Sequence, residues 1–397
     1  MQCTEKYFEA DAFRTRAESV LLAAVPDSRT GGGLIALEGT VFYPEGGGQP
    51  ADRGTLTLPD GTELAVTDVH EQDGILWHSV PSLPDTAVPG ITVEEAIDWD
   101  WRFDKMQQHT GEHILSGILH RMFGAENVGF HIGTPYVRMD TSIPLSAAQL
   151  ARAEAEANAA VRADTPVHCY IPDAATLAAT EYRSKKELDG PVRLVEAGGD
   201  CCACCGTHLA RTGEVGLIKI ISAQHYKTGM RLAVACGQRA YDAVAAICAD
   251  AEAAGRVLSA PAGSLTPSVE NRQNGEAVLK QRIAALQNAL ADAYVQAAAP
   301  DRPAVLWAEG ADGDGLRRIA MAVCAGTNQV ACALAPGGQG LSYALAAPDG
   351  TDARALGRAL NEAFAGRGGG KPAFCQGSLA QPGLTPDVVR EKLSTLL

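Results

Sequence analysis

Two pairs of metal-binding side chains share the same four-residue spacing. The first pair is His109 and His113, and the second is Cys204 and His208. Residues i and i+4 of a helix lie on one face, so the two imidazoles of the first pair can reach one ion. A thiolate and an imidazole from the second pair complete a set of donors that suits zinc. The sequence therefore predicts one Zn²⁺ per chain, held by these four residues.

A second interpretation uses the neighbouring thiols instead. Cys201, Cys202, Cys204 and Cys205 could form a thiolate site of their own or a redox pair, since Cys201 and Cys204 read as C-x-x-C. A self-contained Cys₄ zinc site normally uses two pairs of cysteines separated by a loop. Four thiols within five residues cannot all reach one ion without strain, which favours the mixed His/Cys site.

The first pair also permits an enzymatic alternative. The pattern His109-x-x-Glu112-His113 matches the inverted zinc-peptidase motif, in which Glu112 would activate a zinc-bound water. A motif this short is a hypothesis that needs its structural context.

A glycine-rich segment at Tyr43–Pro50 would allow a ligand to approach the backbone and places the Gln49 amide beside it. The simpler interpretation is a tight β turn. Both interpretations predict a loop here.

A second glycine-rich loop at 366–372 could offer backbone N–H groups and the cations Arg367 and Lys371 to a phosphate. It is not a Walker A loop, because Ala365 replaces its first glycine and Pro372 its Ser/Thr. ATP binding is therefore not expected.

The elements around these residues predict an α+β fold. Apolar residues at helical spacing predict a helix over 100–122 that carries the histidine pair, and Ser146 with Gln149 forms a capping box for a helix ending near 163. Short alternating runs predict a small antiparallel β domain over 30–93 and further strands over 167–221. The latter stretch includes the basic residues Arg183, Lys185, Lys186 and Arg193.

The C-terminal third has its own pattern. A helix over 239–258 precedes a turn-rich boundary, and apolar residues from Leu279 to Ala297 then repeat at alternating spacings of four and three. This short heptad seam fits equally a helix packed on its own domain and a dimerising coiled coil over 268–299. Alternating strand and helix patterns beyond 303 predict a small α/β domain.

These patterns give a division into four parts. We expect an N-terminal β-barrel-like domain over 1–95, a zinc-containing α+β domain over 96–258, a linker and possible dimerising helix over 259–300, and a C-terminal α/β domain over 301–397.

Composition restricts the functional classes. The 397 residues have a formal net charge of −14, so a polyanion would need a local basic patch. The apolar runs are too short for a membrane helix, and the N-terminus lacks the basic and apolar regions of a secretory signal. We therefore expect a cytoplasmic protein without a membrane partner.

The motifs together resemble the editing domain of alanyl-tRNA synthetase and the free-standing AlaX trans-editing proteins. The segment Thr40–Gln49 with Asp52 and Gly54 resembles T-x-F-Y-x-E-x-G-G-Q-x-x-D-x-G. His109–His113 resembles H-T-x-x-H, and Cys204–His208 resembles C-G-G-T-H. The order of these segments matches along nearly the whole chain.

The C-terminal part resembles the same family. Gly368–Gln376 is similar to the G-G-G-x-P-x-x-A-Q segment of the synthetase's C-terminal domain, which indicates the long AlaX subtype. The chain departs from the family at two positions: Cys205 replaces a glycine and Cys375 an alanine.

The resemblance implies hydrolysis of the ester between a wrong amino acid and tRNA(Ala), chiefly serine and in second place glycine. The family places Gln49 in the editing pocket, and a positioned hydroxyl such as that of Thr40 can select a small hydroxyl-bearing substrate; both are candidate catalytic residues. The candidate tRNA contacts are Arg183, Lys185, Lys186, Arg367, Gly368, Gly369, Gly370 and Lys371. The rival interpretations are a catalytically silent, zinc-containing tRNA-binding protein and, less favoured, the peptidase.

Overall fold

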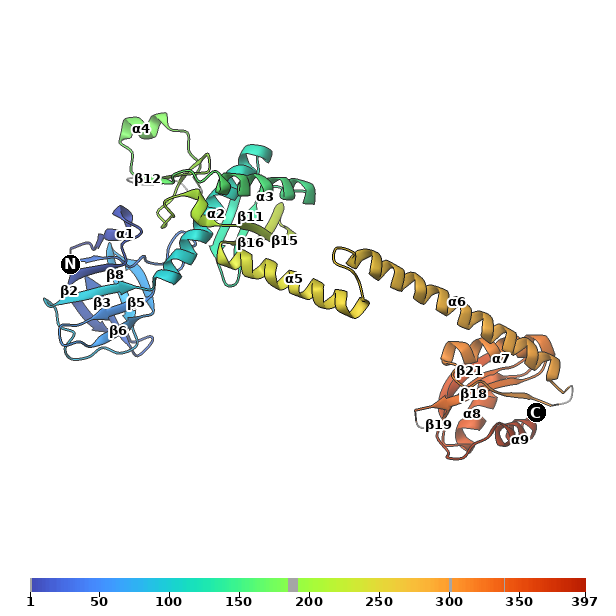
Figure 1. The fold of residues 1–397 in the computed structure, drawn as a ribbon. Coiled ribbons are helices and arrows are strands. Elements are labelled where there is room, and N and C mark those ends of the chain that lie inside the picture. The colour runs from blue at the N-terminus through green and yellow to red at the C-terminus, as the bar shows by residue number, and fades with distance from the viewer. Residues whose placement is uncertain (1, 185–191, 300–301, 339) are drawn as a thin grey trace. The chain divides into compact units, whose positions relative to one another are not determined.

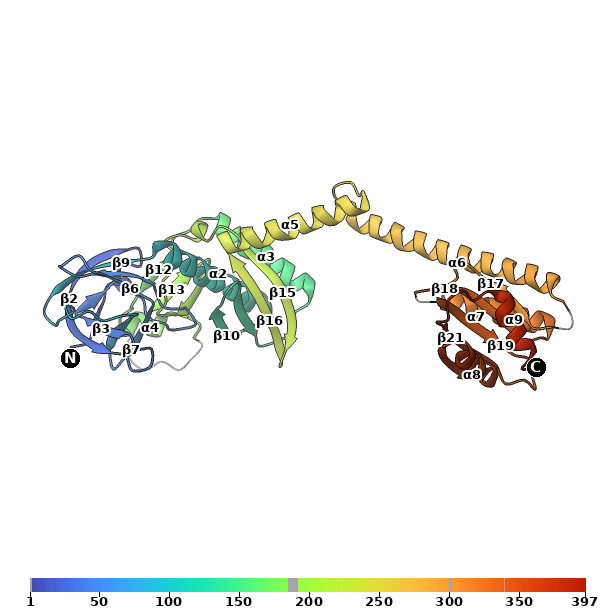
Figure 2. The ribbon, with the colours of Figure 1, turned by 90° about the horizontal axis from the view of Figure 1, so that it is seen from below.

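The computed structural model describes residues 2–184, 192–299, 302–338 and 340–397. The chain packs into two compact units, Met1–Glu252 and Ala253–Leu397, which are described separately below. Figures 1 and 2 show the helices and sheets of each unit. The mixture of helices with several sheets confirms the predicted α+β class.

The first unit begins with a seven-stranded antiparallel sheet in the order β6-β5-β9-β2-β3-β8-β7. Buried residues alternate with exposed ones along β6 and with half-buried ones along β8, as expected for strands that cover a core on one face. A short parallel pair, β1 with β4, and helix α1 accompany the sheet. The bounds are β1 Glu5–Lys6, α1 Tyr7–Ala10, β2 Arg16–Pro26, β3 Gly33–Leu37, β4 Gly39–Thr40, β5 Gly54–Thr57, β6 Glu63–Val66, β7 Asp68–Gln72, β8 Ile75–Val80 and β9 Thr92–Ile97.

Helix α2, Trp99–Phe123, is the central element of the rest of this unit. Asp98 caps its start by accepting from Trp101 N, and Gly124 ends it at φ 65°. Helix α3, Ala147–Arg162, packs beside α2 and has the predicted capping box between Ser146 and Gln149. The predicted helices at 100–122 and after Ser146 are therefore confirmed.

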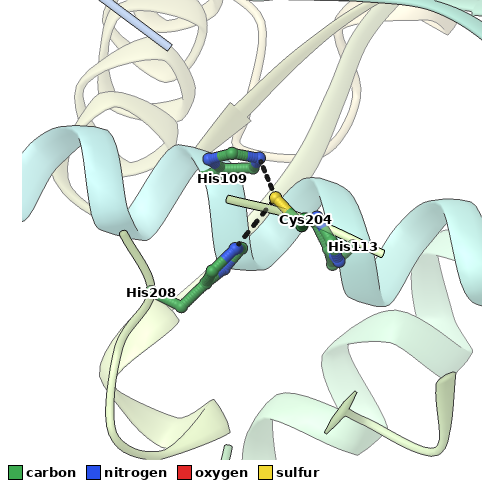
Figure 3. Close-up of side chains that lie close together, drawn as sticks. All are labelled: His109, His113, Cys204 and His208. Atoms are coloured by element: carbon green, nitrogen blue, oxygen red, sulfur yellow. Dashed lines mark hydrogen bonds between the residues drawn. The ribbon is translucent and has the colours of Figure 1, made fainter. Parts of the chain in front are cut away.

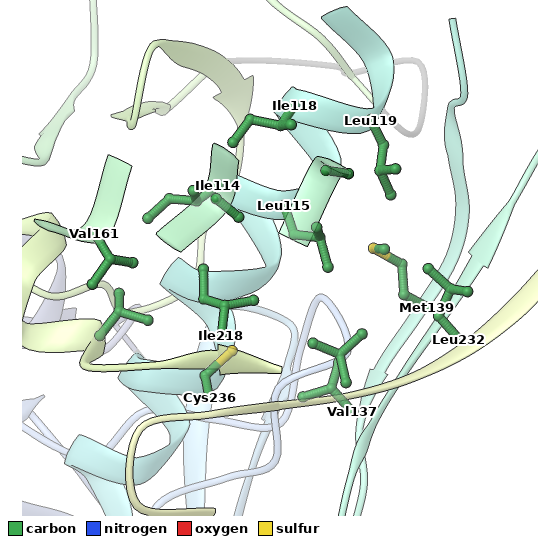
Figure 4. Close-up of a cluster of buried hydrophobic side chains, with 14 of the residues drawn as sticks. Ile114, Leu115, Ile118, Leu119, Val137, Met139, Val161, Ile218, Leu232 and Cys236 are labelled. Carbon is green, nitrogen blue, oxygen red and sulfur yellow. The ribbon is translucent and has the colours of Figure 1, made fainter. Parts of the chain in front are cut away.

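A four-stranded sheet in the order β10-β11-β16-β15 packs with α2 and α3 around one apolar core. Figure 4 shows Leu115 and Leu119 of α2 on the side of Met139 of this sheet, whereas Ile114 lies on the side of Val161 of α3. The strands are β10 Asn127–Ile132, β11 Val137–Thr141, β15 Ile218–Tyr226 and β16 Gly229–Cys236. This core fixes the position of the helix that carries the histidine pair.

A smaller sheet in the order β12-β13-β14 carries the cysteine-rich segment. Its strands are β12 His168–Tyr170, β13 Leu194–Ala197 and β14 Asp200–Ala203, with helix α4 Ala174–Ala179 between β12 and β13 and the 3₁₀ helix η1 Thr212–Val215 after β14. Gly117 of α2 lets Asp200 approach closely, because a Cβ on Gly117 would lie 2.4 Å from the Asp200 side chain. The start of β14 is thereby packed directly on α2.

The second unit contains a five-stranded sheet in the order β17-β18-β19-β21-β20. Only β17 and β18 are parallel; the other neighbours are antiparallel. The elements after helix α5, Gln238–Leu258, are α6 Leu265–Ala297, β17 Ala304–Trp307, α7 Gly313–Thr327, β18 Ala331–Gly337, β19 Gly340–Ala346, α8 Ala353–Ala363, β20 Arg367–Lys371, β21 Phe374–Leu379 and α9 Pro386–Ser394. No helix in the described ranges is long and apolar enough to cross a membrane.

Two local predictions differ from the structure. The sequence patterns missed β2, because its run of Leu, Ala and Val has no clean two-residue alternation. The glycine-rich segment at 366–372 is not a loop: Arg367–Lys371 forms an edge strand paired with β21. The four-part division of the chain stays a prediction.

Candidate metal centre

His109 and His113 lie one turn apart on the buried part of α2, and their ring centroids are 5.2 Å apart. Cys204 and His208 come from the segment that follows β14. Figure 3 shows the four side chains converging, with Cys204 Sγ 3.4 Å from both His109 Nε2 and His208 Nε2. One donor atom from each of the four residues lies within 4.8 Å of the others. The structure therefore brings together the four predicted ligands.

Two of the donor distances are close to those of a tetrahedral zinc site. With Zn–N near 2.0–2.1 Å and Zn–S near 2.3 Å, tetrahedral geometry puts nitrogen and sulfur roughly 3.6 Å apart. The two N···S distances of 3.4 Å are close to this value. Gly206 N also donates to Cys204 Sγ at 3.3 Å, an interaction that favours the thiolate. These donors can hold a metal ion, and their chemistry suits zinc.

Two of the histidines also have polar partners at their second ring nitrogen. His109 Nδ1 lies 2.8 Å from Gln49 Oε1, and His208 Nδ1 lies 3.3 Å from Thr110 Oγ. Metal-binding histidines usually donate their other N–H to such an acceptor, which fixes the ring orientation and the tautomer. Both contacts leave Nε2 directed at Cys204.

A cavity of about 520 Å³ adjoins the cluster. The Phe130 ring stacks on His109 with centroids 5.0 Å apart, and it lines the cavity together with Cys204 and Arg193. The complete lining is Gly47, Gly48, His109, His113, Asn127, Val128, Gly129, Phe130, Ser184, Val192, Arg193, Cys202, Ala203, Cys204 and Cys205. This volume lies in the range of small-molecule binding pockets.

The first glycine-rich segment is a tight turn docked beside this cavity. Gly46 and Gln49 bond each other through their backbones, and Gly48 O accepts from Ile132 N at 2.7 Å. Gly48 has φ +86°, and a Cβ there would lie 2.7 Å from the Phe130 ring. Gln49 itself is fully buried and contacts His109 and Thr207.

Thr40, the other candidate catalytic residue, lies in a buried polar group within the seven-stranded sheet. Its Oγ is 2.9 Å from His78 Nε2 and 2.5 Å from Glu95 Oε2, and it accepts from Phe42 N at 3.1 Å. A hydroxyl offers one donor and two acceptor positions, so three protein partners saturate it. Direct contact with a substrate would require Thr40 to exchange one of these hydrogen bonds.

The proton count in this group indicates a neutral Glu95. Burial lowers the pKa of His78 to about 4, and its Nδ1–H donates to Ile35 O, so Nε2 is an acceptor. The single Thr40 proton then goes to His78, and Glu95 must supply its own proton to Thr40. Burial raises the pKa of Glu95 to about 7, although the hydrogen bond that Val41 N donates to its carboxyl opposes the rise.

The remaining thiols do not gather around an ion of their own. In the described ranges, the grouping of metal-binding donors that includes a cysteine is Cys204 with the three histidines. Cys201 and Cys202 lie on β14, whereas Cys205 is exposed and lines the cavity. Burial raises the pKa of Cys201 to about 11, which keeps its thiol protonated at neutral pH.

Glu112, the base required by the peptidase alternative, is buried and accepts a hydrogen bond from Asn127 Nδ2. It is absent from the cavity lining, where Asn127 lies instead. This placement does not favour Glu112 as a base that acts on a bound substrate.

The basic residues predicted to contact tRNA differ in their surroundings. Arg183 pairs with Asp200 and also donates to Ser116, and only 14% of its side chain is exposed. Arg367 and Lys371 are exposed at the two ends of β20, with Gly368–Gly370 between them. Lys185 and Lys186 lie outside the described residues.

The sequence did not predict the contacts that Arg193 and Phe130 make with the candidate metal centre. Arg193 was assigned to a basic segment, but it is buried and donates to the carbonyls of Cys204 and Gly206, so it holds the metal-binding segment. Nothing in the local sequence pattern predicts that Phe130 stacks on His109.

The fold and this cluster define a mixed α+β protein with a His₃Cys centre suited to zinc. Residues 192–232 match the threonyl and alanyl tRNA synthetase second additional domain, and residues 12–101 match class II (A) tRNA synthetases. The chain is 34% identical over 214 residues to the alanyl-tRNA editing protein AlaX-L of Pyrococcus horikoshii. The matched region covers 52% of each of the two chains.

The chain is also 32% identical over 371 residues to the alanine–tRNA ligase of Halobacterium salinarum, covering 89% of this chain and 39% of the ligase. It thus spans about half or less of the length of these relatives. The C-Ala domain of Aquifex aeolicus alanyl-tRNA synthetase matches with 21% identity and a TM-score of 0.21, over 23% of this chain and 90% of that domain. The sequence relatives confirm the predicted resemblance to AlaX-type editing proteins and alanyl-tRNA synthetase.

Proposed function

We propose that the protein is a zinc-dependent trans-editing hydrolase that removes a wrong amino acid from tRNA(Ala), chiefly serine and in second place glycine. The observation that carries the proposal is the convergence of His109, His113, Cys204 and His208 beside a cavity, in a chain similar to an alanyl-tRNA editing protein. One zinc ion per chain would bind these four residues.

The proposed reaction is hydrolysis of an ester. Water adds to the acyl carbonyl carbon, the bond from that carbon to the ribose oxygen breaks, and the products are a free amino acid and a tRNA with its terminal hydroxyl restored. A bound zinc ion would supply Lewis-acid polarisation of water or of the ester. The cavity of about 520 Å³ has room for an amino acid attached to a nucleoside.

The chain's own residues orient this site. His109 and His208 are held by Gln49 and Thr110, and Arg193 holds the backbone around Cys204. Phe130 forms an apolar wall of the cavity next to His109. Selection of serine through Thr40 stays a prediction, with the requirement that its saturated hydroxyl exchanges a partner.

Recognition of tRNA(Ala) is part of the proposal. Exposed Arg367 and Lys371 on β20, with Gly368, Gly369 and Gly370 between them, are the supported candidates for phosphate contact. Arg183 is mostly occupied by Asp200, and the roles of Lys185 and Lys186 stay predictions. A cytoplasmic location and a homodimer through α6 are also retained as proposals.

A silent zinc-containing tRNA-binding protein is the second candidate, because four protein donors around one ion resemble a closed structural site. Catalysis at the metal would need one ligand to be displaceable. The test is hydrolysis of Ser-tRNA(Ala) and Gly-tRNA(Ala), with Ala-tRNA(Ala) as the control substrate. Selective release of serine supports editing, whereas tRNA binding by zinc-loaded protein without release of any amino acid supports the silent protein.

A further inference from the structure

Gln49 is a buried amide that links the turn at 46–49 to the metal centre. Its Oε1 lies 2.8 Å from His109 Nδ1, and its Nε2 donates to Thr207 Oγ at 2.8 Å. Thr207 lies between the ligand Cys204 and the ligand His208. Gln49 is 0% exposed, and the walls of the cavity are formed by other residues, so a bound substrate does not reach its amide in this arrangement.

The orientation of the amide is determined by its neighbours. Thr207 N donates to Gln49 Oε1 at 3.3 Å, on the same oxygen that faces His109. A flipped amide would direct its NH₂ group at this backbone N–H, so the flipped orientation is disfavoured. Because Oε1 is an acceptor, His109 must have its proton at Nδ1, which leaves the Nε2 lone pair directed at Cys204.

Close packing holds this amide in place from two sides. The Gly48 carbonyl accepts from Ile132 N, which seats the turn on β10. On the other side, a Cβ on Gly206 would lie 2.2 Å from His109 Cε1 and 3.2 Å from Gln49 Oε1. The turn, the strand and the Cys204–His208 segment therefore meet around the His109 ring.

We infer that Gln49 is a positioning residue that holds His109 in its metal-binding tautomer and, through Thr207, ties the metal-binding segment to the seven-stranded sheet region. It acts on the metal centre without touching the substrate. Metal affinity then depends on the docking of the 46–49 turn. This inference rests on the metal-binding part of the proposed function.

The test is the zinc dissociation constant of the full chain, measured by chelator competition. Gln49→Ala should weaken zinc binding about 10–100-fold, the usual effect of losing such an outer partner. Gln49→Glu should bind zinc at least as tightly as the wild type, because a carboxylate also accepts from His109 Nδ1–H and the Thr207 hydroxyl can donate to it. Gln72→Ala, at an exposed glutamine of β7, is the matched control and should leave the affinity unchanged.

A second measurement reports the tautomer directly. In the metal-free protein, the ¹⁵N chemical shifts of the His109 ring should show the Nδ1–H tautomer in the wild type and a mixture of tautomers in Gln49→Ala. Circular dichroism of the metal-free variants checks that they are folded.

Three outcomes separate the possibilities. Wild-type affinity in a folded Gln49→Ala variant that has lost deacylation would overturn the inference and indicate substrate contact. An equally weak Gln49→Glu variant would also overturn it, because the acceptor at Nδ1 would then not be the important feature. A wild type that binds no zinc would instead remove the metal-dependent function and this inference together.

Discussion

The packing of His109 leaves no room for a side chain at position 206. A Cβ on Gly206 would lie 2.2 Å from His109 Cε1 and 2.5 Å from Nδ1. The neighbouring Cys205, which stands where the family has a glycine, is exposed toward the cavity and has no such constraint. The two adjacent positions therefore differ in what they tolerate.

We predict that Gly206→Ala weakens zinc binding by about tenfold or more, because the added methyl group displaces the His109 ring from its partners. Cys205→Gly is the matched variant and should keep wild-type affinity. Chelator competition measures both. Equal zinc affinity in Gly206→Ala and the wild type would show that the segment moves without disturbing the ligand.

The buried group of Thr40, His78 and Glu95 makes stability depend on pH. The pKa of Glu95 rises from about 4.3 in an unfolded chain to about 7 in the fold, so the folded state binds the extra proton between these values. Its stabilising contribution is complete below about pH 4.3 and is lost as the pH rises through about 7. His78, with its pKa lowered to about 4, has the opposite effect as the pH falls.

The comparison of wild type with Glu95→Gln isolates the glutamate, since His78 is present in both. We predict that the free energy of unfolding of the wild type, relative to this variant, decreases as the pH rises from about 4.3 to about 7. Denaturant unfolding at several pH values measures the difference. The exposed neighbour Glu94→Gln is the control, and a pH-independent difference for Glu95→Gln would contradict the neutral carboxyl.

Helix α6 is divided into two parts by its packing. Near its C-terminal end, Ala291 is buried against α7 and Tyr294 OH donates to Trp307 O, so this part packs on its own domain. Earlier in the helix, Leu279, Ile283 and Leu286 are 61%, 54% and 65% exposed. The exposed part of the heptad seam is therefore the candidate dimer contact.

We predict that Ile283→Glu with Leu286→Glu converts a dimer into a monomer, because the substitutions place charges within the apolar seam. Sedimentation equilibrium measures the change. Gln281→Glu, at an exposed position of the same helix, should leave the dimer intact, and zinc content should not change in either variant. A monomeric wild type at micromolar concentration would reject the dimer.

Strand β20 presents two cations at the edge of its sheet. Every residue from Arg367 to Lys371 is exposed, although Gly368 and Gly370 face the neighbouring strand so closely that a Cβ would lie within 2.3 Å of the backbone of β21. The glycines thus permit the close strand pairing, and the cations remain available to a phosphate.

We predict that Arg367→Ala with Lys371→Ala weakens tRNA binding and lowers the slope of log affinity against log salt by about one for each lost contact. Arg354→Ala is the control, since Arg354 is an exposed arginine of the same unit that pairs with Asp352. Filter binding at several salt concentrations measures both. Unchanged affinity and slope in the double variant would exclude this strand from the contact.

At the scale of the whole molecule, local sequence patterns predicted the four metal ligands better than the residues that hold those ligands in position. Helical spacing identified His109 and His113, and the same spacing selected Cys204 among four thiols. The contact between Gln49 and His109 joins residues 60 positions apart, so it depends on how the turn docks on β10 rather than on any local pattern. Likewise, pairing with β21 makes 367–371 a strand, against the low strand propensity of glycine.

The acidic composition of the whole chain also bears on the proposed binding of nucleic acid. A net charge of −14 disfavours unspecific attraction to nucleic acid, so the proposed binding to tRNA requires a few locally placed cations. The proposed editing site lies in the unit Met1–Glu252, and the supported phosphate contacts Arg367 and Lys371 lie in the unit Ala253–Leu397. Each can therefore be tested by substitutions that leave the other unit unchanged.

The most direct test of the central claim is a zinc titration of the metal-free protein, with Ser-tRNA(Ala) hydrolysis measured at each step. The account predicts that activity rises in proportion to added zinc and stops rising at one equivalent per chain. Cys204→Ala with His208→Ala should take up no tightly bound zinc and release no serine. Hydrolysis that does not depend on zinc, or that persists in this variant, would contradict the claim that the four-residue cluster forms the hydrolytic site.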